Sequence, residues 1–387
     1  MGRLAIVLSH PVQYYSPWFR WLKAHTALEF RVFYLWNFGV TAQRDPQFGA
    51  TFQWDVDLLA GYDHEFVPNV ARDPGTHHFS GLDNPTLGAR LRAWQPAAVL
   101  LFGYAYRSHL RVILRPPAPL IFRGDSHLLG SAPSWLKRFL LRRLYARFAA
   151  ITYVGSANRD YFRALGVAEA KLFFAPHSVN TVHFNPADPA ARTAAAALRS
   201  ELGLAGRRVV LFAGKFSAAK QPVELLQAFQ QVATPADALV FVGDGEEKDR
   251  LSALASAAPA ACVRFLPFAN QSEMPARYLL ADIFALPSRG SYETWGLAVN
   301  EAMHLGVPCL VSDRVGCQRD LVLPGETGWV FPADDAAALG TTLRTALRSP
   351  PDELARLSQN ASSLIAHYTY QQTSDGLLQA LASLPAR

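Results

Sequence analysis

The chain contains 387 residues, of which 50% are hydrophobic and 18% are charged, and its formal net charge is +6 at pH 7. This length favours two domains with ordinary hydrophobic cores, and the composition excludes a largely disordered chain. No apolar run approaches the about 20 residues that a membrane-spanning helix needs, so a soluble or peripheral protein is expected.

The N-terminus opens on the apolar run Leu4–Leu8 without a signal-peptide pattern, which predicts a cytoplasmic protein. The three cysteines, Cys262, Cys309 and Cys317, have neither CxxC spacing nor a nearby histidine cluster. Such cysteines are typical of reduced cytoplasmic thiols, and no metal site is expected.

Short apolar runs in the first half of the chain predict the strands of a parallel sheet. Their Val, Ile, Leu and Phe content without strict alternation is typical of strands buried on both faces. The predicted strands are Leu4–Leu8, Phe30–Tyr34, Ala98–Phe102, Leu120–Phe122, Ala150–Val154 and Leu172–Ala175. Residues 37–90 are rich in Asp, Pro, Gly and His, which predicts a loop-rich insertion.

Residues 134–148 concentrate the basic side chains and predict a helix. Lys137, Arg138, Arg142 and Arg147 leave a broad apolar band on that helix. The band comprises Trp135, Leu136, Phe139, Leu140, Leu144 and Phe148. Two interpretations stay open, a domain helix with a solvated basic face and a surface that docks on anionic lipid headgroups at the inner face of the cytoplasmic membrane. Nucleic acid is not an expected partner, because the basic residues form no platform interleaved with aromatic residues.

A turn-rich seam at about 182–206 separates the two halves of the chain. Further buried strands are predicted after it at Val209–Phe212, Ala238–Val242, Val263–Pro267, Ile283–Leu286 and Pro308–Val311. Helical patterns between the strands complete βαβ units, so the fold class is α/β with two doubly wound halves. A ligand is expected in the cleft at the carboxyl ends of the strands.

The loops that follow the strands of the second half carry the first candidate site residues. Gly214 lets the chain turn after Val209–Phe212, and Lys215 and Lys220 flank the loop that enters the next helix. These lysines suit a diphosphate, although loop lysines alone are more often solvated surface. Gly243 follows the next strand, where turn geometry alone explains it. Phe268 is either a neighbour of a nucleobase or a core residue.

Residues 287–302 carry the strongest signal, because two carboxylates bracket a predicted helix start. Glu293 lies in the loop and Glu301 inside the helix that follows. The backbone N–H groups between them offer an anion site. Donors for a diphosphate with acceptors for sugar hydroxyls on either side suit a nucleotide sugar.

In this order, these motifs resemble those of the retaining glycosyltransferases of family 4. The resemblance covers residues 207–365 and extends more weakly through 150–186. It implies the GT-B fold: two Rossmann-like domains facing across a cleft, with a C-terminal helix that crosses back onto the first domain. The implied boundaries are an acceptor-binding domain over 1–185, a nucleotide-sugar domain over 205–367, and the returning helix within about 368–387. The resemblance also implies catalysis without a metal.

The resemblance implies a role for each candidate residue of the second half. Lys215 and Lys220 would contact the donor diphosphate and stabilise the leaving group. Glu293 would accept hydrogen bonds from donor-sugar hydroxyls, and Glu301 would bind the ribose. The backbone N–H groups of the loop would approach the phosphate or the sugar, and they belong to Thr294, Trp295, Gly296 and Leu297.

The first half departs further from the family. Its His-Pro-x-Gln-Tyr segment resembles one subgroup of the family, and His10, Gln13 and Tyr14 supply side-chain donors where the family usually has glycines. After the strand Leu120–Phe122, Asp125 or His127 would lie beside the reacting anomeric carbon. A helix N-cap is the structural alternative for Asp125.

The sequence therefore predicts a retaining, metal-independent hexosyltransferase. It would move a sugar from a nucleotide diphosphate sugar to a hydroxyl of a glycan or lipid-linked acceptor, in the synthesis of cell-surface polysaccharide or glycolipid. Two alternatives stay open: a non-catalytic subunit that binds a nucleotide sugar, and a non-hydrolysing sugar-nucleotide epimerase on the same architecture.

Overall fold

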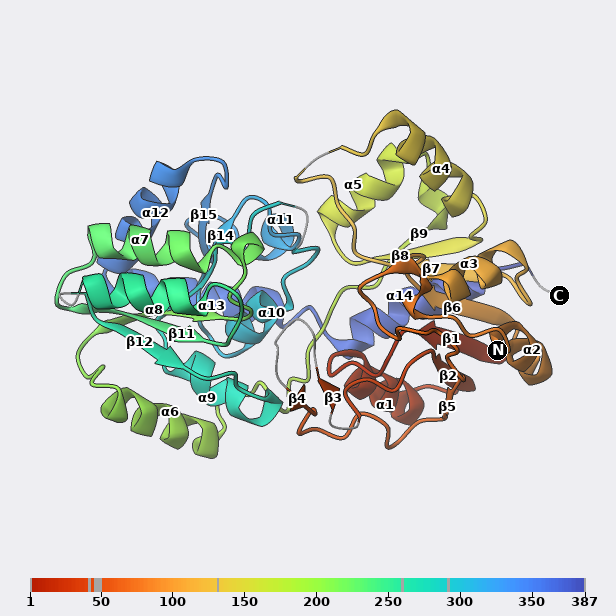
Figure 1. The fold of residues 1–387 in the computed structure, drawn as a ribbon, viewed down its shortest axis with the longest axis horizontal. Coiled ribbons are helices and arrows are strands. Elements are labelled where there is room, and N and C mark those ends of the chain that lie inside the picture. The colour runs from red at the N-terminus through yellow and green to blue at the C-terminus, as the bar shows by residue number, and fades with distance from the viewer. Residues whose placement is uncertain are drawn as a thin grey trace.

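The computed structural model describes residues 2–40, 43–44, 51–130, 132–258, 261–290 and 293–385. Outside these residues lie Ser291 and Tyr292, which belong to the 287–302 segment that carries Glu293 and Glu301. Parts of the predicted 37–90 insertion and of the predicted C-terminal helix also lie outside them. The described chain forms two α/β units side by side, each built on one large sheet (Figure 1). None of the described helices is long and apolar enough to cross a membrane.

The N-terminal unit contains a seven-stranded sheet in which every pair of neighbouring strands is parallel. In spatial order its strands are β5 (His64–Phe66), β2 (Phe30–Tyr34), β1 (Leu4–Leu8), β6 (Ala98–Phe102), β7 (Leu120–Arg123), β8 (Ala150–Tyr153) and β9 (Leu172–Phe174). Its helices are α1 (Tyr15–His25), α2 (Leu87–Trp94), α3 (Arg107–Leu114), α4 (Trp135–Tyr145) and α5 (Ser156–Ala164). The short strands β3 (Gln43–Arg44) and β4 (Thr51–Phe52) pair with each other.

The C-terminal unit contains a six-stranded sheet that is also parallel throughout. Its order is β12 (Val263–Leu266), β11 (Asp237–Val242), β10 (Arg208–Ala213), β13 (Ile283–Leu286), β14 (Cys309–Ser312) and β15 (Gly328–Phe331). Its helices are α6 (Pro189–Glu201), α7 (Pro222–Val232), α8 (Lys248–Ala257), α9 (Met274–Leu279), α10 (Leu297–His304), α11 (Gln318–Leu321), α12 (Ala336–Arg348) and α13 (Pro351–Ile365). When β10 is counted as the first strand of this unit, the spatial order is the 3-2-1-4-5-6 arrangement of a Rossmann sheet.

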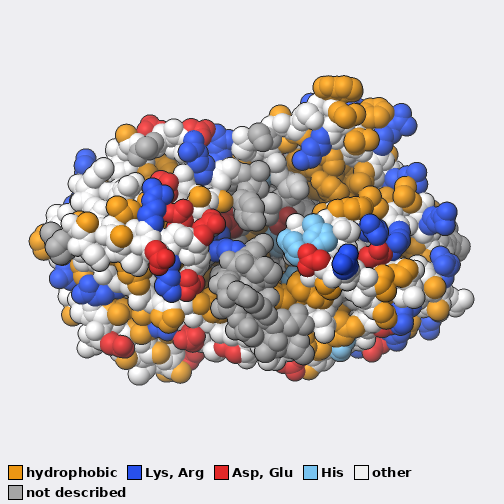
Figure 2. Space-filling model, in the orientation of Figure 1, with side chains coloured by type: hydrophobic (Ala, Val, Ile, Leu, Met, Phe, Trp, Pro, Cys, Tyr) orange, Lys and Arg blue, Asp and Glu red, His pale blue; other side chains and the backbone are white. Residues whose placement is uncertain are grey.

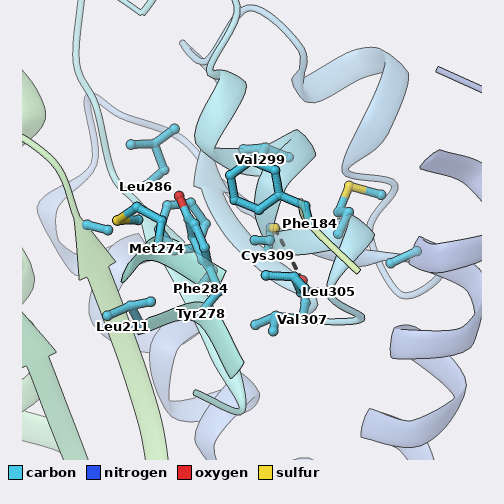
Figure 3. Close-up of a cluster of buried hydrophobic side chains, with 14 of the residues drawn as sticks. Phe184, Leu211, Met274, Tyr278, Phe284, Leu286, Val299, Leu305, Val307 and Cys309 are labelled. Carbon is cyan, nitrogen blue, oxygen red and sulfur yellow. Dashed lines mark hydrogen bonds between the residues drawn. The ribbon is translucent and has the colours of Figure 1, made fainter. Parts of the chain in front are cut away.

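A hydrophobic cluster fixes α9 and α10 against this sheet. Figure 3 shows Tyr278 from α9 and Val299 from α10 packed with Phe284 and Leu286 of β13. Each of these four side chains is almost completely buried. The packing sets the position of α10, the helix that carries Glu301.

The chain passes from the N-terminal to the C-terminal unit once and then returns. The returning helix, α14 (Tyr370–Ala382), packs on β8, β9 and α1 of the N-terminal unit (Figure 1). The Trp18 indole of α1 donates a 3.0 Å hydrogen bond to Ser374 Oγ. This arrangement confirms the predicted GT-B fold class with its C-terminal helix crossing back.

Two strands of the large sheets, β5 and β15, were not predicted from the sequence, and neither was the short pair of β3 and β4. β5 is only three residues long and lies inside the stretch predicted as a loop-rich insertion. β15 begins at a glycine and lies at the edge of its sheet. The long buried runs were predicted well, and Leu4–Leu8, Phe30–Tyr34, Ala98–Phe102 and Ile283–Leu286 have the predicted bounds. Apolar runs are therefore a good guide to central strands, whereas two of the four edge strands of the large sheets, β5 and β15, were missed.

Gly376 provides a test of how α14 docks on the N-terminal sheet. A Cβ at Gly376 would lie 1.9 Å from the Phe174 carbonyl oxygen, whereas a Cβ at Gly340 in α12 would meet no atom within 4 Å. We expect Gly376→Ala to destabilise the protein by about 1–3 kcal/mol through overpacking. Gly340→Ala should stabilise it by up to about 1 kcal/mol through helix propensity. Urea unfolding of both variants measures the change in the free energy of unfolding, which should have opposite signs in the two variants. A stabilised Gly376→Ala protein would contradict this packing.

Candidate functional site

A cleft of about 330 Å³ lies between the two units, lined by loops at the carboxyl ends of both sheets. It contains most of the predicted site residues: Gln13, Asp125, Gly214, Lys220, Gly243, Phe268, Glu293, Thr294, Trp295, Gly296, Leu297 and Glu301. His10, His127 and Lys215 do not line it. The cleft therefore brings together residues from both halves of the sequence.

The loops after β10 and β13 form the charged centre of the cleft. These two strands are neighbours at the point where the strand order reverses, which is where ligands bind in open parallel sheets. Lys220 follows β10 and Glu293 follows β13, and Lys220 Nζ lies 2.7 Å from Glu293 Oε2. The Ser288 hydroxyl donates a 3.1 Å hydrogen bond to the same oxygen. Glu293 is thus held by two groups on its own unit.

Two glycines let the β10 and β11 loops approach each other beside Lys220. Gly243 has a φ of +140°, and a Cβ there would lie 2.0 Å from the Gly214 carbonyl oxygen. Gly214 has a φ of +149°. Any side chain at Gly243 would push the two loops apart, so this glycine has a packing role that turn geometry alone did not reveal.

The N-terminus of α10 opens on the same cleft. Gly296 caps the helix with a φ of +98°, and among the described residues no side chain forms a capping hydrogen bond there. The first helical residues, Leu297 and Ala298, line the cleft. The Trp295 indole donates a 2.8 Å hydrogen bond to Asn300 Oδ1, which ties the loop to its own helix. First-turn N–H groups have no partner within a helix, so this terminus can bind an anion.

Glu301 is a buried carboxyl group, 3% exposed, at the inner end of the cleft. Burial raises its pKa to about 7, although hydrogen bonds from Tyr278, Tyr14 and Gln271 oppose the rise. The Tyr278 hydroxyl donates to Oε2 at 2.7 Å. Oε1 is buried and has no hydrogen-bond partner among the described residues. Glu301 therefore offers an acceptor that a ligand hydroxyl could satisfy.

Asp125 approaches the cleft from the N-terminal unit, in the loop after β7. Its side chain is 36% exposed, and its Oδ2 lies 3.4 Å from His177 Nε2. Burial opposes its ionisation, but interactions with His177 and a hydrogen bond from Thr294 outweigh burial and hold the pKa of Asp125 below its ordinary value. Burial in turn lowers the pKa of His177. Asp125 is therefore an ionised carboxylate at neutral pH.

The remaining predicted residues lie elsewhere. His127 Nε2 donates a 3.2 Å hydrogen bond to the Glu293 carbonyl oxygen, and its Nδ1 accepts one from the Leu129 N–H at 3.2 Å. Nε2 thus joins the two units, and Nδ1 binds the backbone of its own loop. The His10 ring packs edge-on against Trp36 and Phe38. Lys215 is partly buried next to the cleft-lining Gly214.

The cleft also contains residues outside the predicted set. Tyr14 was noted only as a donor within its motif, yet it interacts with Glu301 across the two units. Tyr278 and Gln271 also lie beside Glu301. A buried glutamate requires hydrogen-bond donors, so the prediction of Glu301 implies that some donors lie beside it. The sequence positions of Tyr14, Tyr278 and Gln271 do not identify them as those donors. Trp54 lines the cleft from the irregular stretch, where no pattern predicted it.

Comparisons with known proteins place these features in a family. Residues 196–364 match the family described as Glycosyl transferases group 1. A GDP-mannose-dependent alpha-(1-6)-phosphatidylinositol monomannoside mannosyltransferase of Mycobacterium tuberculosis is 31% identical over 304 residues, which cover 74% of this chain and 74% of that protein. The enzyme with the same description from Mycolicibacterium smegmatis is 32% identical over 239 residues, 60% of this chain, and the match spans 61% of its length.

Solved structures support the fold. The Anabaena Alr3699/HepE structure in complex with UDP-glucose has a TM-score of 0.73 and 17% identity, and the match covers 99% of this chain and 100% of that one. WaaG, a glycosyltransferase involved in lipopolysaccharide biosynthesis, has a TM-score of 0.66 and 15% identity, with 98% of each chain covered. At these identities the likeness concerns the fold alone.

The raised pKa of Glu301 predicts how stability depends on pH. The folded state holds the Glu301 proton more tightly than the unfolded state, so stability falls as pH rises from about 4.5 to about 7. Glu301→Gln lacks this titration. Relative to the parent protein, the variant should gain up to about 3 kcal/mol of stability between pH 4.5 and pH 8. Urea unfolding at both pH values tests this, and a stability difference independent of pH would contradict it.

Proposed function

Because this chain belongs to the group 1 glycosyl transferases, we propose that it transfers a sugar from a nucleotide diphosphate sugar to a hydroxyl group of a glycan or lipid-linked acceptor, with retention of anomeric configuration. One observation carries the proposal. The Lys220–Glu293 pair, the α10 N-terminus and buried Glu301 line a single cleft, and Asp125 of the other unit lines it too. Together these groups suit the binding of the diphosphate, the sugar and the ribose of a donor.

The donor would lie along the C-terminal unit. Lys220 and the first N–H groups of α10 would bind its diphosphate, because they are the cationic and partially positive groups of the cleft. Glu293 would then exchange part of its contact with Lys220 for the sugar hydroxyls. Glu301 Oε1 would accept from the ribose, and Phe268 would lie beside the base. The mycobacterial relatives use GDP-mannose, so GDP-mannose is the first donor to try.

The transfer would create opposite charges at two places in the cleft. As the bond from the anomeric carbon to the phosphate oxygen breaks, the leaving diphosphate becomes more negative and the sugar more positive. Lys220 and the α10 N-terminus would stabilise the first charge, and the Asp125 carboxylate the second. The acceptor oxygen forms its bond on the same face, and its proton passes to the leaving diphosphate. We propose that no metal is needed, because Lys220 and the N–H groups already supply positive charge.

The first test is donor binding by thermal shift with GDP-, UDP-, ADP- and dTDP-sugars. A donor present at 100 times its dissociation constant should stabilise the protein by about 2.7 kcal/mol. Lys220→Ala should lose most of this shift. The matched control is Lys248→Ala, which breaks an exposed pair with Asp244 outside the cleft and should retain the shift. An equal loss in both variants would contradict the proposed diphosphate site.

The second test is catalytic. Glu293→Gln should lower kcat for transfer on the order of 100-fold or more, and activity should survive dialysis against EDTA. The two alternatives give different results. An epimerase would convert the nucleotide sugar without any acceptor, and a scaffold would bind donor while Glu293→Gln left glycan synthesis in cells unchanged.

We further propose that α4 docks on an anionic membrane, where a lipid-linked acceptor would reside. Trp135 is 81% exposed, and Leu136, Phe139 and Leu140 are exposed beside it. Hydrophobic and basic side chains gather on the surface around α4 (Figure 2). The predicted band is corrected at its other end, because Phe148 belongs to the core and Leu144 is partly buried. The exposed apolar group is thus shorter than predicted, with basic residues beside it.

Vesicle sedimentation tests this surface. At low salt, vesicles with anionic lipid should sediment the protein, and vesicles of neutral lipid should bind much less. Replacing Arg142 and Arg143 by Gln, or Trp135 and Phe139 by Ala, should weaken binding. Arg344→Gln on the C-terminal unit should not. Equal binding of all these proteins, or none to anionic vesicles, would contradict docking through α4.

A further inference from the structure

The connection between β5 and α2 forms a closed loop, residues 69–83, on the N-terminal unit. Its ends are joined by a 2.8 Å hydrogen bond from the Val70 N–H to the Asp83 carbonyl oxygen. The Asn69 amide donates to the Gly81 carbonyl oxygen at 2.8 Å. Tyr106 of the N-cap position of α3 donates to the Thr76 carbonyl oxygen at 3.2 Å. These bonds hold the loop in one conformation before any ligand binds.

Three metal-ligating side chains converge on this loop. His77 Nε2 lies 3.0 Å and His78 Nε2 lies 3.3 Å from the same oxygen, Oδ2 of Asp73. One ligand atom from each residue falls within 4.8 Å of the others. Zinc bonds of about 2.0–2.2 Å at a tetrahedral angle separate ligand atoms by roughly 3.4 Å. The side chains need only small movements to surround an ion.

The neighbours of the two histidines also suit a metal site. His78 Nδ1 lies 3.0 Å from Ser80 Oγ, so a proton on Nδ1 can be donated to the hydroxyl, leaving the Nε2 lone pair free for a metal. His78 Nε2 also lies 3.0 Å from the Asp73 carbonyl oxygen, so metal binding would replace this contact and leave the imidazole proton on Nδ1. The His77 ring lies over Gly75, where a Cβ would be 2.5 Å from Nδ1. Only a glycine at this position leaves room for that ring.

We propose that Asp73, His77 and His78 bind a divalent transition-metal ion, with Zn²⁺ as the best match. Two imidazole nitrogens and one carboxylate oxygen form a ligand set of intermediate hardness, which suits Zn²⁺. Mg²⁺ and Ca²⁺ prefer ligand sets made of oxygen atoms alone. The side chains of Asp73, His77 and His78 are 70%, 43% and 34% exposed, so water completes the coordination.

This ion has a structural role, separate from sugar transfer. None of its three ligands lines the cleft. Binding would instead replace the hydrogen bonds among Asp73, His77 and His78 by bonds to one centre, and so stabilise the loop that Tyr106 attaches to α3. The site is independent of the proposed function, because its ligands need no donor or acceptor sugar.

Isothermal titration of the chelator-treated, untagged protein with ZnCl₂ tests the site. We expect saturable binding of one ion per chain, and a rise in Tm that EDTA reverses. His77→Ala and His78→Ala should each abolish the binding. Ser80→Ala should weaken it about 10-fold to 100-fold, because that residue only orients a ligand. His367→Ala removes another exposed histidine and should leave affinity unchanged.

Two results would overturn the site. One is the absence of saturable Zn²⁺ binding by the parent protein. The other is binding that persists in a His77→Ala/His78→Ala double variant, which would assign the ion to other residues such as the partly exposed Cys262. Circular dichroism of each variant checks that it is folded. Because the three ligands are exposed, their replacement should leave the fold intact.

Discussion

The two large sheets are parallel throughout the described residues, and this constraint places the loops that carry Lys220, Glu293 and Asp125 at one edge of each sheet. Parallel neighbours require crossover helices, so every strand ends on the same side and every return path covers a face. When the carboxyl ends of two such sheets face each other, the loops that follow the strands form a cleft. A polar residue in a loop that directly follows a strand then lies near the cleft, wherever that strand occurs in the sequence.

Polar contacts join the two units beside a hydrophobic cluster that spans them, with Val154 and Trp295 among its members. Asp320 accepts hydrogen bonds at 3.0 Å from both the N–H and the hydroxyl of Ser156, at the start of α5. Arg319 lies 3.2 Å from Asp160, and the Arg314 guanidinium donates to the Leu129 carbonyl oxygen. Water can replace such contacts, and each is worth about 1–3 kcal/mol because one partner is charged. These polar contacts alone therefore oppose separation of the two units only modestly.

The sequence was a better guide to position along the chain than to side-chain direction. Buried central strands and the segment from Glu293 to Glu301 were predictable, because burial and helix starts leave local patterns. Asp125 and His127 follow the same strand, yet one lines the cleft and the other binds the Glu293 backbone. Local sequence does not encode that difference. It depends on where the other unit lies, as does the approach of Tyr14 to Glu301.

His177 shows how far the cleft depends on both units. Its buried ring lies between Asp125 and Trp295, and its carbonyl oxygen accepts a 3.3 Å hydrogen bond from Asn300 of α10. The low pKa of Asp125 depends on His177 and on Thr294 of the C-terminal unit. The Asp125 carboxylate thus acquires its full set of partners only when the units are together, so groups from both units hold it in the cleft.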